Sequence, residues 1–457
     1  MRKIENYVQG SWITGDGEEL VAYNAINGDE IGALSSAGLD YNAILTYGRE
    51  VGGPALRKMT FQERGLMLKA LALHLMGRKD KFYELSAATG ATRTDSWIDI
   101  EGGIGNLFAN ASLRRQFPDL PYAVEGETVP LSKGGSFIGH HILVPKRGVA
   151  VHINAFNFPI WGMLEKVAVN LLAGIPAVVK PSEYTSYLTE LMLKEIIDSG
   201  ILPDGSIQMV SGLGRGILDY VTSEDVITFT GSAHTGKKLK ALPNILENSV
   251  PFNLEADSLN ATMLGEDSGP GTAEFDLFVK STRAEITVKA GQKCTAIRRI
   301  LVPEKYMEDV QIALGKQLAK TTIGDPSVEG VRMGPLASRT QVDRVRENVE
   351  LLMKEQEVVY GDMDNFDIVG GDKEKGAFFS PILFRNDAPF EKTRVHEIEA
   401  FGPVSTLMPY KDMDEAVRIA EMGKGSLVTS ITTANDELAK EFVLNTAHMH
   451  GRILVLN

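Results

Sequence analysis

The side chain with the most evident chemistry is Cys294, the only cysteine in the chain. A single thiol forms no intramolecular disulfide and, without further cysteines, no zinc cluster, so it serves either as a buried apolar group or as a nucleophile. Gly291 suits a turn that lifts a nearby side chain out of regular structure, and Lys289, Lys293 and Arg298 favour the thiolate. We interpret Cys294 as a nucleophile, with a buried structural role as the alternative.

The composition bounds the kind of protein that carries this thiol. With 457 residues, 43% of them hydrophobic and 23% charged, the chain predicts a globular protein of two or three domains. A formal net charge of -13 argues against proteins that wrap nucleic acid or lie on an anionic membrane, because both need a basic surface. The first residues show no apolar signal segment, and Asn170, Gly174 and Pro176 interrupt the most apolar tract, 167–179. We therefore expect a cytoplasmic protein.

Strand-like and helical segments alternate between residues 148 and 230. The strand-like segments are 149–153, 177–179, 207–210 and 226–230, and the helical segments between them include 161–172 and 188–197. This order predicts βαβ units and a parallel sheet with helices on both faces. Ligands bind such sheets at the carboxyl ends of the strands, so we expect binding residues in the loops 154–159, 180–183, 211–214 and 231–236. Upstream, Thr60 and Glu63 form a capping-box pattern that predicts the start of a scaffold helix.

The last of these loops also matches a nucleotide-binding pattern. Gly231 to Lys237 reads G-x-x-x-x-G-K after a predicted strand and before a helical segment, as in a Walker A loop. Lys238, however, occupies the place of the Ser or Thr that binds magnesium, which disfavours a P-loop NTPase. A glycine-rich turn before a helix equally suits a dinucleotide pyrophosphate, and a plain tight turn is the simplest alternative.

The segments after residue 257 predict a second α/β domain, with Cys294 at its edge. Residues 275–289 and 307–319 have a helical pattern, and 299–302 a strand-like one. His448 and His450 form an H-x-H pair, but no carboxylate or cysteine partner lies nearby in the sequence. We therefore predict no metal site.

Six short motifs occur in order along the chain. They are AFNFP (155–159), KPSE (180–183), FTGS (229–232) with Gly236, NLE (253–255), GQKC (291–294) and EAFGP (399–403). Together they resemble the motif set of the aldehyde dehydrogenase superfamily, and the resemblance covers essentially the whole chain. A set of six in the family's order is specific, although each motif alone is weak.

The resemblance implies an α/β fold of the aldehyde-dehydrogenase type. This fold has a Rossmann-type cofactor domain, an α/β catalytic domain and a small oligomerisation segment. We expect the NAD(P)-binding domain at 1–123 and 147–257, an oligomerisation hairpin at 124–146 and the catalytic domain at 258–457. The sequence stops within an apolar strand-like run, where the family continues to an oligomerisation strand. We expect that this strand is missing here, and that the complete protein is a homo-oligomer, a dimer or higher.

The resemblance also implies catalytic roles for three residues. Cys294 would attack the aldehyde carbon, and the Asn157 amide with the Cys294 backbone N–H would donate hydrogen bonds to the resulting oxyanion. Glu255 would then activate water to release the acid. Its presence favours hydrolysis, because CoA-acylating members of the family generally lack this glutamate.

Candidate cofactor residues follow from the same motifs. They are Lys180, Ser182 and Glu183 at the adenine ribose, Gly231 and Ser232 at the pyrophosphate, Glu399 and Phe401 at the nicotinamide side, and Gly214. Gly212 and Gly214 are more typical of turn residues than of direct ligands. A glutamate at position 183 suits a free 2′-hydroxyl, whereas Ser182 and the narrower resemblance described next favour a 2′-phosphate. We predict NADP, with NAD as a possible cofactor.

A narrower resemblance concerns the substrate. The tracts 152–159, 255–260 and 289–299 are similar to the dehydrogenase part of the bifunctional ring-opening enzyme of phenylacetate degradation and to the semialdehyde dehydrogenase of aerobic benzoyl-CoA degradation. They imply a CoA-linked aliphatic semialdehyde as the small-molecule partner. One departure is that Asp257 and Ser258 replace the Gly-Gly of most members, which puts the nicotinamide contacts of that loop in question. A CoA-acylating dehydrogenase and an inactive structural relative remain alternatives.

Overall fold

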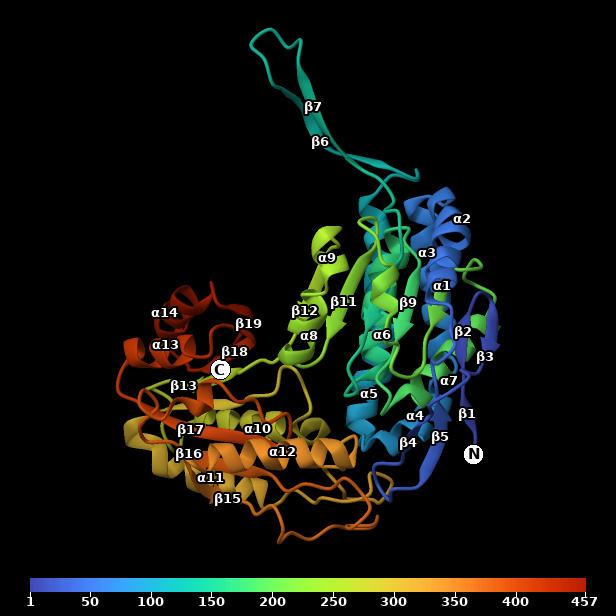
Figure 1. The fold of residues 1–457 in the computed structure, drawn as a ribbon. Helices are drawn as coiled ribbons and strands as arrows, with labels where there is room; N and C mark the ends of the chain where they lie inside the picture. Colours follow the sequence, from blue (N-terminus) through green and yellow to red (C-terminus); the bar gives the residue numbers. More distant parts are fainter. The chain divides into compact units, whose positions relative to one another are not determined.

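Two large sheets organise the chain, each in a unit of its own (Figure 1). The computed structural model describes residues 1–457. Unit 1 comprises Met1–Tyr23, Glu30–Ser86 and Ser96–Ala256, and unit 2 comprises Asn24–Asp29, Ala87–Asp95 and Asp257–Asn457. The chain enters unit 2 directly after Glu255 and Ala256, so the predicted base and the predicted nucleophile belong to different units.

The sheet of unit 1 has seven strands, five of them parallel neighbours: the four that the sequence predicted and β12 in addition. In spatial order they are β12 (Phe252–Glu255), β11 (Val226–Thr230), β8 (Ala150–Ile153), β9 (Ala177–Lys180), β10 (Ile207–Met209), β2 (Asn6–Val8) and β3 (Ser11–Ile13). The strands β8, β9 and β10 follow one another in one direction, and the chain then returns to place β11 on the other side of β8. This order creates a topological switch point between β8 and β11, where open α/β sheets bind their ligands.

Helices cover both faces of this sheet. They are α1 (Tyr41–Tyr47), α2 (Gly53–Lys58), α3 (Phe61–Met76), α4 (Lys79–Ser86), α5 (Arg93–Leu113), α6 (Pro159–Leu172), α7 (Ser186–Asp198), α8 (Ala233–Lys240) and α9 (Pro243–Glu247). Val149 and Val151 pack with α1 and α9 on one face, while α6 packs against β8 and β9. The predicted capping box at Thr60 and Glu63 is confirmed at the start of α3.

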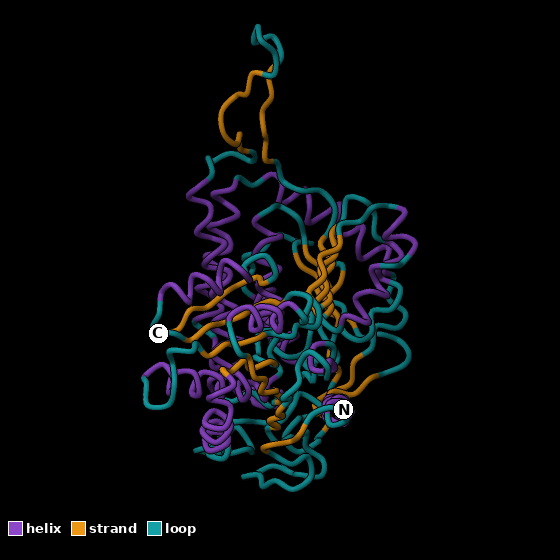
Figure 2. Tube along the Cα trace, turned by 90° about the vertical axis from the view of Figure 1, so that its left-hand side faces the viewer, coloured by secondary structure: helices purple, strands orange, loops and turns teal.

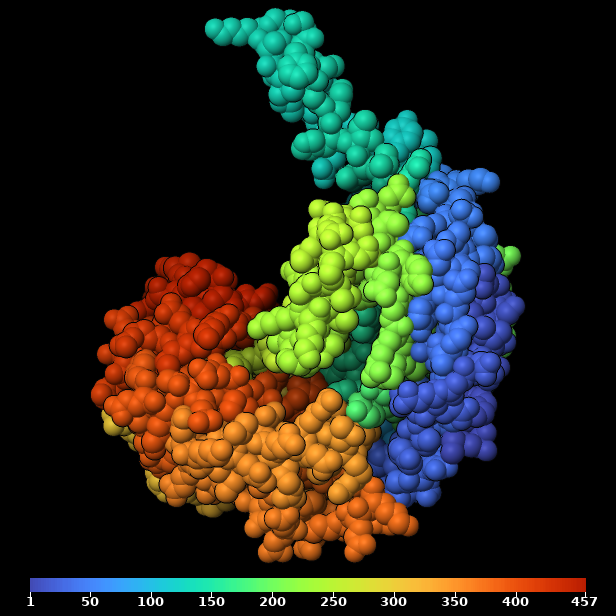
Figure 3. Space-filling model, in the orientation of Figure 1, coloured from blue at the N-terminus to red at the C-terminus, as the bar shows by residue number.

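A long hairpin extends from unit 1. It is formed by β6 (Ala123–Pro130) and β7 (Ile138–Leu143), which pair with each other in an antiparallel two-stranded sheet. Figures 2 and 3 show it as a projection away from the rest of unit 1. Its side chains are almost all exposed, including Phe137 at 63% and Ile142 at 57%. A small separate sheet of β1 (Lys3–Ile4), β5 (Glu30–Leu34) and β4 (Leu20–Tyr23) completes unit 1.

Unit 2 contains a second seven-stranded sheet. Its strands are, in spatial order, β15 (Glu357–Tyr360), β16 (Ile382–Arg385), β17 (Val404–Tyr410), β14 (Arg299–Pro303), β13 (Ala261–Leu264), β18 (Ser426–Thr432) and β19 (His450–Leu456). All neighbouring pairs are parallel except β15 with β16. The sequence therefore predicted a second α/β domain correctly.

The helices of unit 2 pack on both faces of its sheet, against side chains that alternate along each strand. These helices are α10 (Ala273–Thr287), α11 (Met307–Leu318), α12 (Arg339–Leu352), α13 (Met413–Glu421) and α14 (Asp436–Thr446). In β14, Ile300 and Val302 pack with α10 and α11, while Leu301 packs with α13 and α14. This period of two is what a strand buried on both faces requires. No helix of either unit combines the length and the apolarity needed to cross a bilayer.

Candidate active site

Asn157 lies in the loop that joins β8 to α6, at the switch point of the unit 1 sheet. The Thr185 hydroxyl donates to the carbonyl of Phe156 (3.2 Å) and holds the middle of this loop. Asp99 Oδ1 accepts the backbone N–H of Trp161 (2.7 Å) and caps the first turn of α6. Asn157 itself is buried, with 8% of its surface exposed.

Glu255 ends β12 on the same carboxyl edge of the unit 1 sheet. It pairs in register with Thr230, the last residue of β11, whose Oγ1 lies 3.4 Å from Glu255 Oε2. The backbone N–H of Gly231 donates to the Glu255 carbonyl (3.2 Å). The carboxylate is partly exposed, which leaves it access to a water molecule. Only one strand, β11, lies between β12 and β8, so Glu255 and Asn157 lie near each other at one edge of the sheet.

The predicted ribose residues gather at the carboxyl ends of β9 and β10. Lys180 is buried, and its Nζ lies 3.7 Å from Glu183 Oε2. Burial lowers the pKa of Lys180, and the charge of Glu183 opposes that shift. Ser182 is also buried. Gly214 has a left-handed φ of +61°, and a Cβ added there would lie 3.1 Å from Lys180 Cγ, so this turn packs closely on the lysine.

The loop after β11 does not have the form of a Walker A loop. Only Gly231 and Ser232 separate the strand from α8, and Ser232 Oγ accepts the N–H of Thr235 as the helix cap. Gly236 lies inside the helix, where any Cβ would overlap Leu254. The P-loop interpretation is therefore wrong, since that motif needs a longer loop whose N–H groups surround the phosphates. Gly236 instead allows α8 to pack closely on β12.

In unit 2, the segment before the nucleophile has a strained backbone. Lys289 (φ 51°), Ala290 (φ 51°) and Gly291 (φ 69°) are successive left-handed residues, so α10 ends at Thr287 rather than at 289 as predicted. Such conformations cost about 1–2 kcal/mol for each residue with a side chain. The Lys289 ammonium donates to the carbonyl and the hydroxyl of Thr89 (3.0 and 2.8 Å). This lysine thus holds the loop in place.

Two buried side chains hold the backbone around Cys294, and one of them, Asn260, was not predicted from the sequence as a site residue. Asn260 is fully buried, and its Nδ2 donates to the carbonyls of Cys294 and Ala296 (2.8 Å each). Its Oδ1 accepts the hydroxyl of Ser258 (2.7 Å). The only sequence signal for Asn260 was its position just after the Asp-Ser departure. Arg298, predicted to favour the thiolate, instead donates through Nη2 to the Gly291 carbonyl (2.8 Å).

Glu399 and Phe401, predicted to lie on the nicotinamide side, meet Arg298 in unit 2. Arg298 Nε lies 3.2 Å from Glu399 Oε1, and its guanidinium carbon lies 5.5 Å from the centre of the Phe401 ring. The N–H of Ser258 donates to Glu399 Oε2 (3.1 Å). Burial raises the pKa of Glu399, and the Arg298 charge with the Ser258 N–H opposes this shift. Ser258 therefore has a bonding role of its own at a position where most of the family has glycine.

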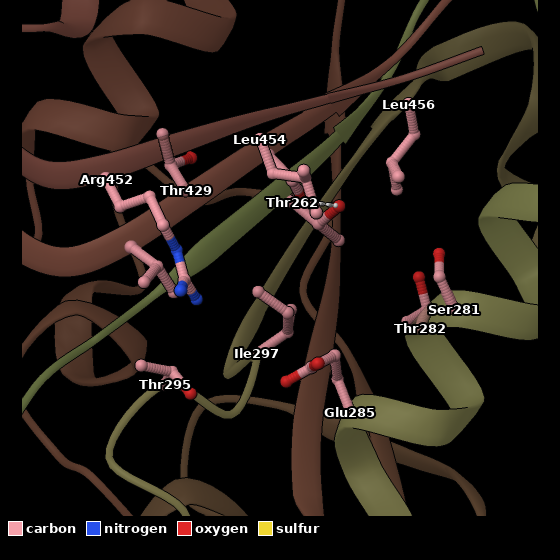
Figure 4. Close-up of a pocket in the computed structure, with 12 residues that line it drawn as sticks. Thr262, Ser281, Thr282, Glu285, Thr295, Ile297, Thr429, Arg452, Leu454 and Leu456 are labelled. Atoms are coloured by element: carbon pink, nitrogen blue, oxygen red, sulfur yellow. Dashed lines mark hydrogen bonds between the residues drawn. The ribbon is translucent and has the colours of Figure 1, made fainter. Parts of the chain in front are cut away.

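The loop 288–298, which joins α10 to β14 and contains the predicted nucleophile Cys294, is the nucleophile loop. A small pocket lies beside it within unit 2 (Figure 4). It is lined by Ser281, Thr282 and Glu285 of α10, by Thr295 and Ile297, by Thr262 of β13, by Val428, Thr429 and Ser430 of β18, and by Arg452, Leu454 and Leu456 of β19. Lys293 Nζ forms an ion pair with Glu285 (2.8 Å), which directs this lysine towards α10. With about 70 Å³, the pocket is too small for a long acyl chain.

The histidines of the chain form no metal centre: no three or more His, Cys, Asp or Glu side chains come together as ligands. His450 Nδ1 instead lies 2.8 Å from the Ser426 hydroxyl. The neighbouring His396 contacts Arg299 Nη1 (3.2 Å) through Nδ1 and the Pro389 carbonyl (2.9 Å) through Nε2. These are structural contacts of unit 2.

The two α/β units and the order of the six motifs are those of an NAD(P)-type dehydrogenase fold. The chain belongs to the aldehyde dehydrogenase family, whose model matches residues 12–450. The predicted α/β fold of the aldehyde-dehydrogenase type is thereby confirmed.

Comparisons with individual relatives agree with this assignment. The chain is 41% identical over 456 residues to a 3,4-dehydroadipyl-CoA semialdehyde dehydrogenase of Aromatoleum evansii, covering 100% of this chain and 88% of the relative. It is 27% identical over 434 residues to a putative aldehyde dehydrogenase of Staphylococcus haemolyticus, covering 93% of this chain and 85% of the relative. A betaine aldehyde dehydrogenase variant of Staphylococcus aureus, solved with NAD+, superposes with a TM-score of 0.86 at 22% identity, covering 99% of this chain and 89% of that one.

Proposed function

We propose that this protein oxidises a CoA-linked aliphatic semialdehyde, formed during aromatic-acid degradation, to the carboxylic acid. The observation that carries the proposal is the 41% identity to a 3,4-dehydroadipyl-CoA semialdehyde dehydrogenase along the whole chain. The presence of Cys294, Glu255 and Asn157 at the family's catalytic positions supports it. The inactive-relative alternative lacks such support, because these three residues are retained.

The proposed chemistry starts at Cys294. Its thiolate adds to the aldehyde carbon, and the Asn157 amide with the Cys294 backbone N–H donates hydrogen bonds to the oxyanion. Hydrogen bonds from Asn260 and Arg298 hold the nucleophile loop in place, so the backbone N–H of Cys294 is oriented before the substrate binds. Loss of hydride from the adduct, for which the cofactor would be the acceptor, leaves a thioester on Cys294. Glu255 then accepts a proton from water, and the activated water hydrolyses this thioester, which releases the acid and the Cys294 thiolate.

The residues of unit 1 fit a dinucleotide. The Lys180 and Glu183 pair lies at the carboxyl end of β9, and the N-terminus of α8, with its N–H groups, follows the strand beside the switch point. We assign Lys180, Ser182 and Glu183 to the adenine ribose, Gly231 and Ser232 to the pyrophosphate, and Glu399 and Phe401 to the nicotinamide side. Gly214 supports Lys180 rather than the ligand. The bound cofactor supplies the hydride acceptor of the oxidation.

We propose NADP as the preferred cofactor. Glu183 would repel a 2′-phosphate, but Lys180 lies next to it and offsets part of its charge. Initial rates with NAD and NADP in parallel test this choice. Glu183→Gln removes the charge and keeps the shape, so we expect it to raise the NADP preference about tenfold. A wild-type protein that prefers NAD would contradict the proposal.

The hairpin supports a proposed homo-oligomer. Its apolar side chains, such as Phe137, Ile138 and Ile142, are more than half exposed, and they form an apolar surface suited to a second copy of the chain. Size-exclusion chromatography with light scattering measures the assembly. Phe137→Ser together with Ile142→Ser should shift it towards the monomer.

The test of the function is the turnover of CoA-linked and simple aldehydes, followed as NADPH formation. We expect activity on the CoA-linked substrate and none measurable for Cys294→Ala, a loss of at least about 10⁴-fold for a missing nucleophile. Persistent NADPH formation in that variant would rule out Cys294. A product that appears only as acyl-CoA, and only with free CoA present, would identify a CoA-acylating dehydrogenase instead.

A further inference from the structure

Arg298 joins two loops of unit 2 that are far apart in the sequence. Its Nη2 donates to the carbonyl of Gly291 in the nucleophile loop (2.8 Å). Its Nη1 donates to the carbonyl of Gly402 (2.8 Å), and its Nε lies 3.2 Å from Glu399 Oε1. The side chain is only 4% exposed. All three nitrogens of the guanidinium are therefore committed to fixed acceptors.

A second path connects the same two loops. Glu399 accepts the backbone N–H of Ser258 (3.1 Å), and the Ser258 hydroxyl donates to Asn260 Oδ1 (2.7 Å). Asn260 Nδ2 then donates to the carbonyl of Cys294 (2.8 Å). Together with the bonds of Arg298 to Glu399 and Gly291, and with the backbone from Gly291 to Cys294, these bonds form a closed ring. The ring is buried, since Ser258 is 4% and Asn260 0% exposed.

The geometry decides between two roles for Arg298. A role in thiolate stabilisation would need the guanidinium directed at the sulfur, but its hydrogen bonds point to backbone carbonyls, and its charge is matched by Glu399. A guanidinium is a rigid planar fork, so three committed bonds fix the relative position of the acceptors. In a buried ring each lost partner leaves a polar group unsatisfied, which makes the arrangement sensitive to any single change.

We propose that Arg298 is a positioning residue that ties the nucleophile loop to the Glu399 loop, with Ser258 and Asn260 forming the return path. The ring gives the Asp-Ser departure a function: where most of the family has glycine, Ser258 links the carboxylate on the cofactor side to the backbone of Cys294. This inference rests on the proposed function for one point only, the assignment of Glu399 to the cofactor.

The first measurement is the rate of Cys294 alkylation by iodoacetamide without cofactor or aldehyde. Cys294 is the only cysteine, so the mass of the intact protein reports this reaction alone. Arg298→Met should slow alkylation about tenfold, the factor that corresponds to one lost charge-assisted hydrogen bond. Arg385→Met is the matched control, because Arg385 also forms an ion pair through Nε, with Asp387, but contacts neither loop. The control should alkylate at the wild-type rate.

Arg298→Lys separates positioning from charge. A lysine keeps a positive charge beside Glu399 but places one ammonium where three nitrogens were needed. We expect NADP affinity, measured by calorimetry, to stay near the wild-type value while alkylation remains about tenfold slow. A purely structural role would instead change both quantities together with the melting temperature.

Ser258→Ala tests the return path without disturbing a buried charge. It removes only the hydroxyl between Asn260 and the backbone of β18, and it should slow alkylation about threefold to tenfold. This variant decides the question if Arg298→Met does not fold. Unchanged alkylation in Ser258→Ala and in a folded Arg298 variant would overturn the proposal. Because alkylation needs no aldehyde, a protein that oxidises none would refute the proposed function and leave this test intact.

Discussion

The two units position their predicted site residues differently. In unit 1, Asn157, Lys180 and Glu255 lie at or just after the carboxyl ends of β8, β9 and β12, and the sheet itself positions them. In unit 2, Cys294 lies in an irregular loop that contains left-handed residues. Two buried side chains hold this loop: Asn260, from a distant segment, and Arg298, from the end of the loop itself. Strand ends position side chains through regular backbone bonds, whereas the nucleophile loop depends on individual polar contacts.

This difference predicts how the site residues of each unit tolerate substitution. A functional side chain at a strand end can be changed with little effect on folding, because the ladder of the sheet remains intact. A change in the nucleophile loop should affect folding and catalysis together, because the same contacts serve both. The following predictions test that contrast.

Glu255→Gln should give the largest effect among the variants of unit 1. Without the carboxylate no base activates water, and the steady-state kcat should fall about 10²- to 10⁴-fold. The thioester on Cys294 should accumulate and be visible as added mass on the intact protein after mixing with aldehyde and cofactor. The melting temperature should stay unchanged. A variant that turns over at the wild-type rate would show that another group is the base.

Asn157→Ala should have the next largest effect. Losing one oxyanion donor typically costs about 3 kcal/mol, so kcat should fall on the order of a hundredfold. The KM for the aldehyde and the melting temperature should change little, because the hydrogen bonds that Thr185 and Asp99 form with this segment remain in the variant. Steady-state kinetics and thermal unfolding measure both. A loss of stability as large as the loss of rate would contradict the contrast between the strand-end residues of unit 1 and the nucleophile loop of unit 2.

The contrast also explains what the sequence could and could not predict. The βαβ order of 148–230 was read correctly because hydrophobic patterns in strands and helices are local, and the motif residues of unit 1 lie next to these strands. The end of α10 was misplaced by two residues, because Lys289 and Ala290 have helix-compatible side chains in left-handed conformations. No local pattern reveals such a backbone, which is imposed by its tertiary contacts.

The supporting residues of unit 2 could not be found by the same reasoning. Asn260 donates to Cys294, 34 positions away, and Arg298 contacts Gly291 and Glu399, 7 and 101 positions away, so their partners depend on the folded arrangement. Arg298 was read as a charge beside a thiol, since its sequence position gives proximity but not direction. The G-x-x-x-x-G-K pattern does not reveal where the helix begins: α8 starts at Ala233, so only Gly231 and Ser232 separate it from β11.

Gly291→Ala should affect stability and activity together. Any Cβ at this position would overlap the Gly402 carbonyl, and φ is left-handed, so unfolding free energy should fall by about 2–3 kcal/mol. Ala290→Gly is the matched control in the same turn: it relieves a left-handed alanine but loses a buried methyl, so it should be close to neutral. Urea unfolding and kcat measure the pair. A Gly291→Ala protein that is inactive yet fully stable would show that the loop is not also a folding element.

Acid stability offers the smallest and most general test of the contrast. Burial lowers the pKa of His152 in unit 1 to about 3, and that of His396 and His450 in unit 2 to about 4. Between about pH 4 and 6.5 the unfolded chain therefore binds protons that the folded chain does not, so stability is lost as the pH falls through this window.

His396→Gln should make the protein less sensitive to acid. Its Nδ1 lies 3.2 Å from a guanidinium nitrogen of Arg299, which makes the protonated form unfavourable beyond the effect of burial. Between pH 7 and pH 5 each such histidine should cost about 1–2 kcal/mol, and the glutamine variant should recover that part, as measured by urea unfolding at both pH values. His141→Gln is the control, because His141 is exposed on the hairpin. Unit 2 contains two such histidines and unit 1 contains one, so acid should lower the urea midpoint of unit 2 more than that of unit 1. Equal decreases in the two midpoints would show that carboxylates rather than these imidazoles limit the acid stability.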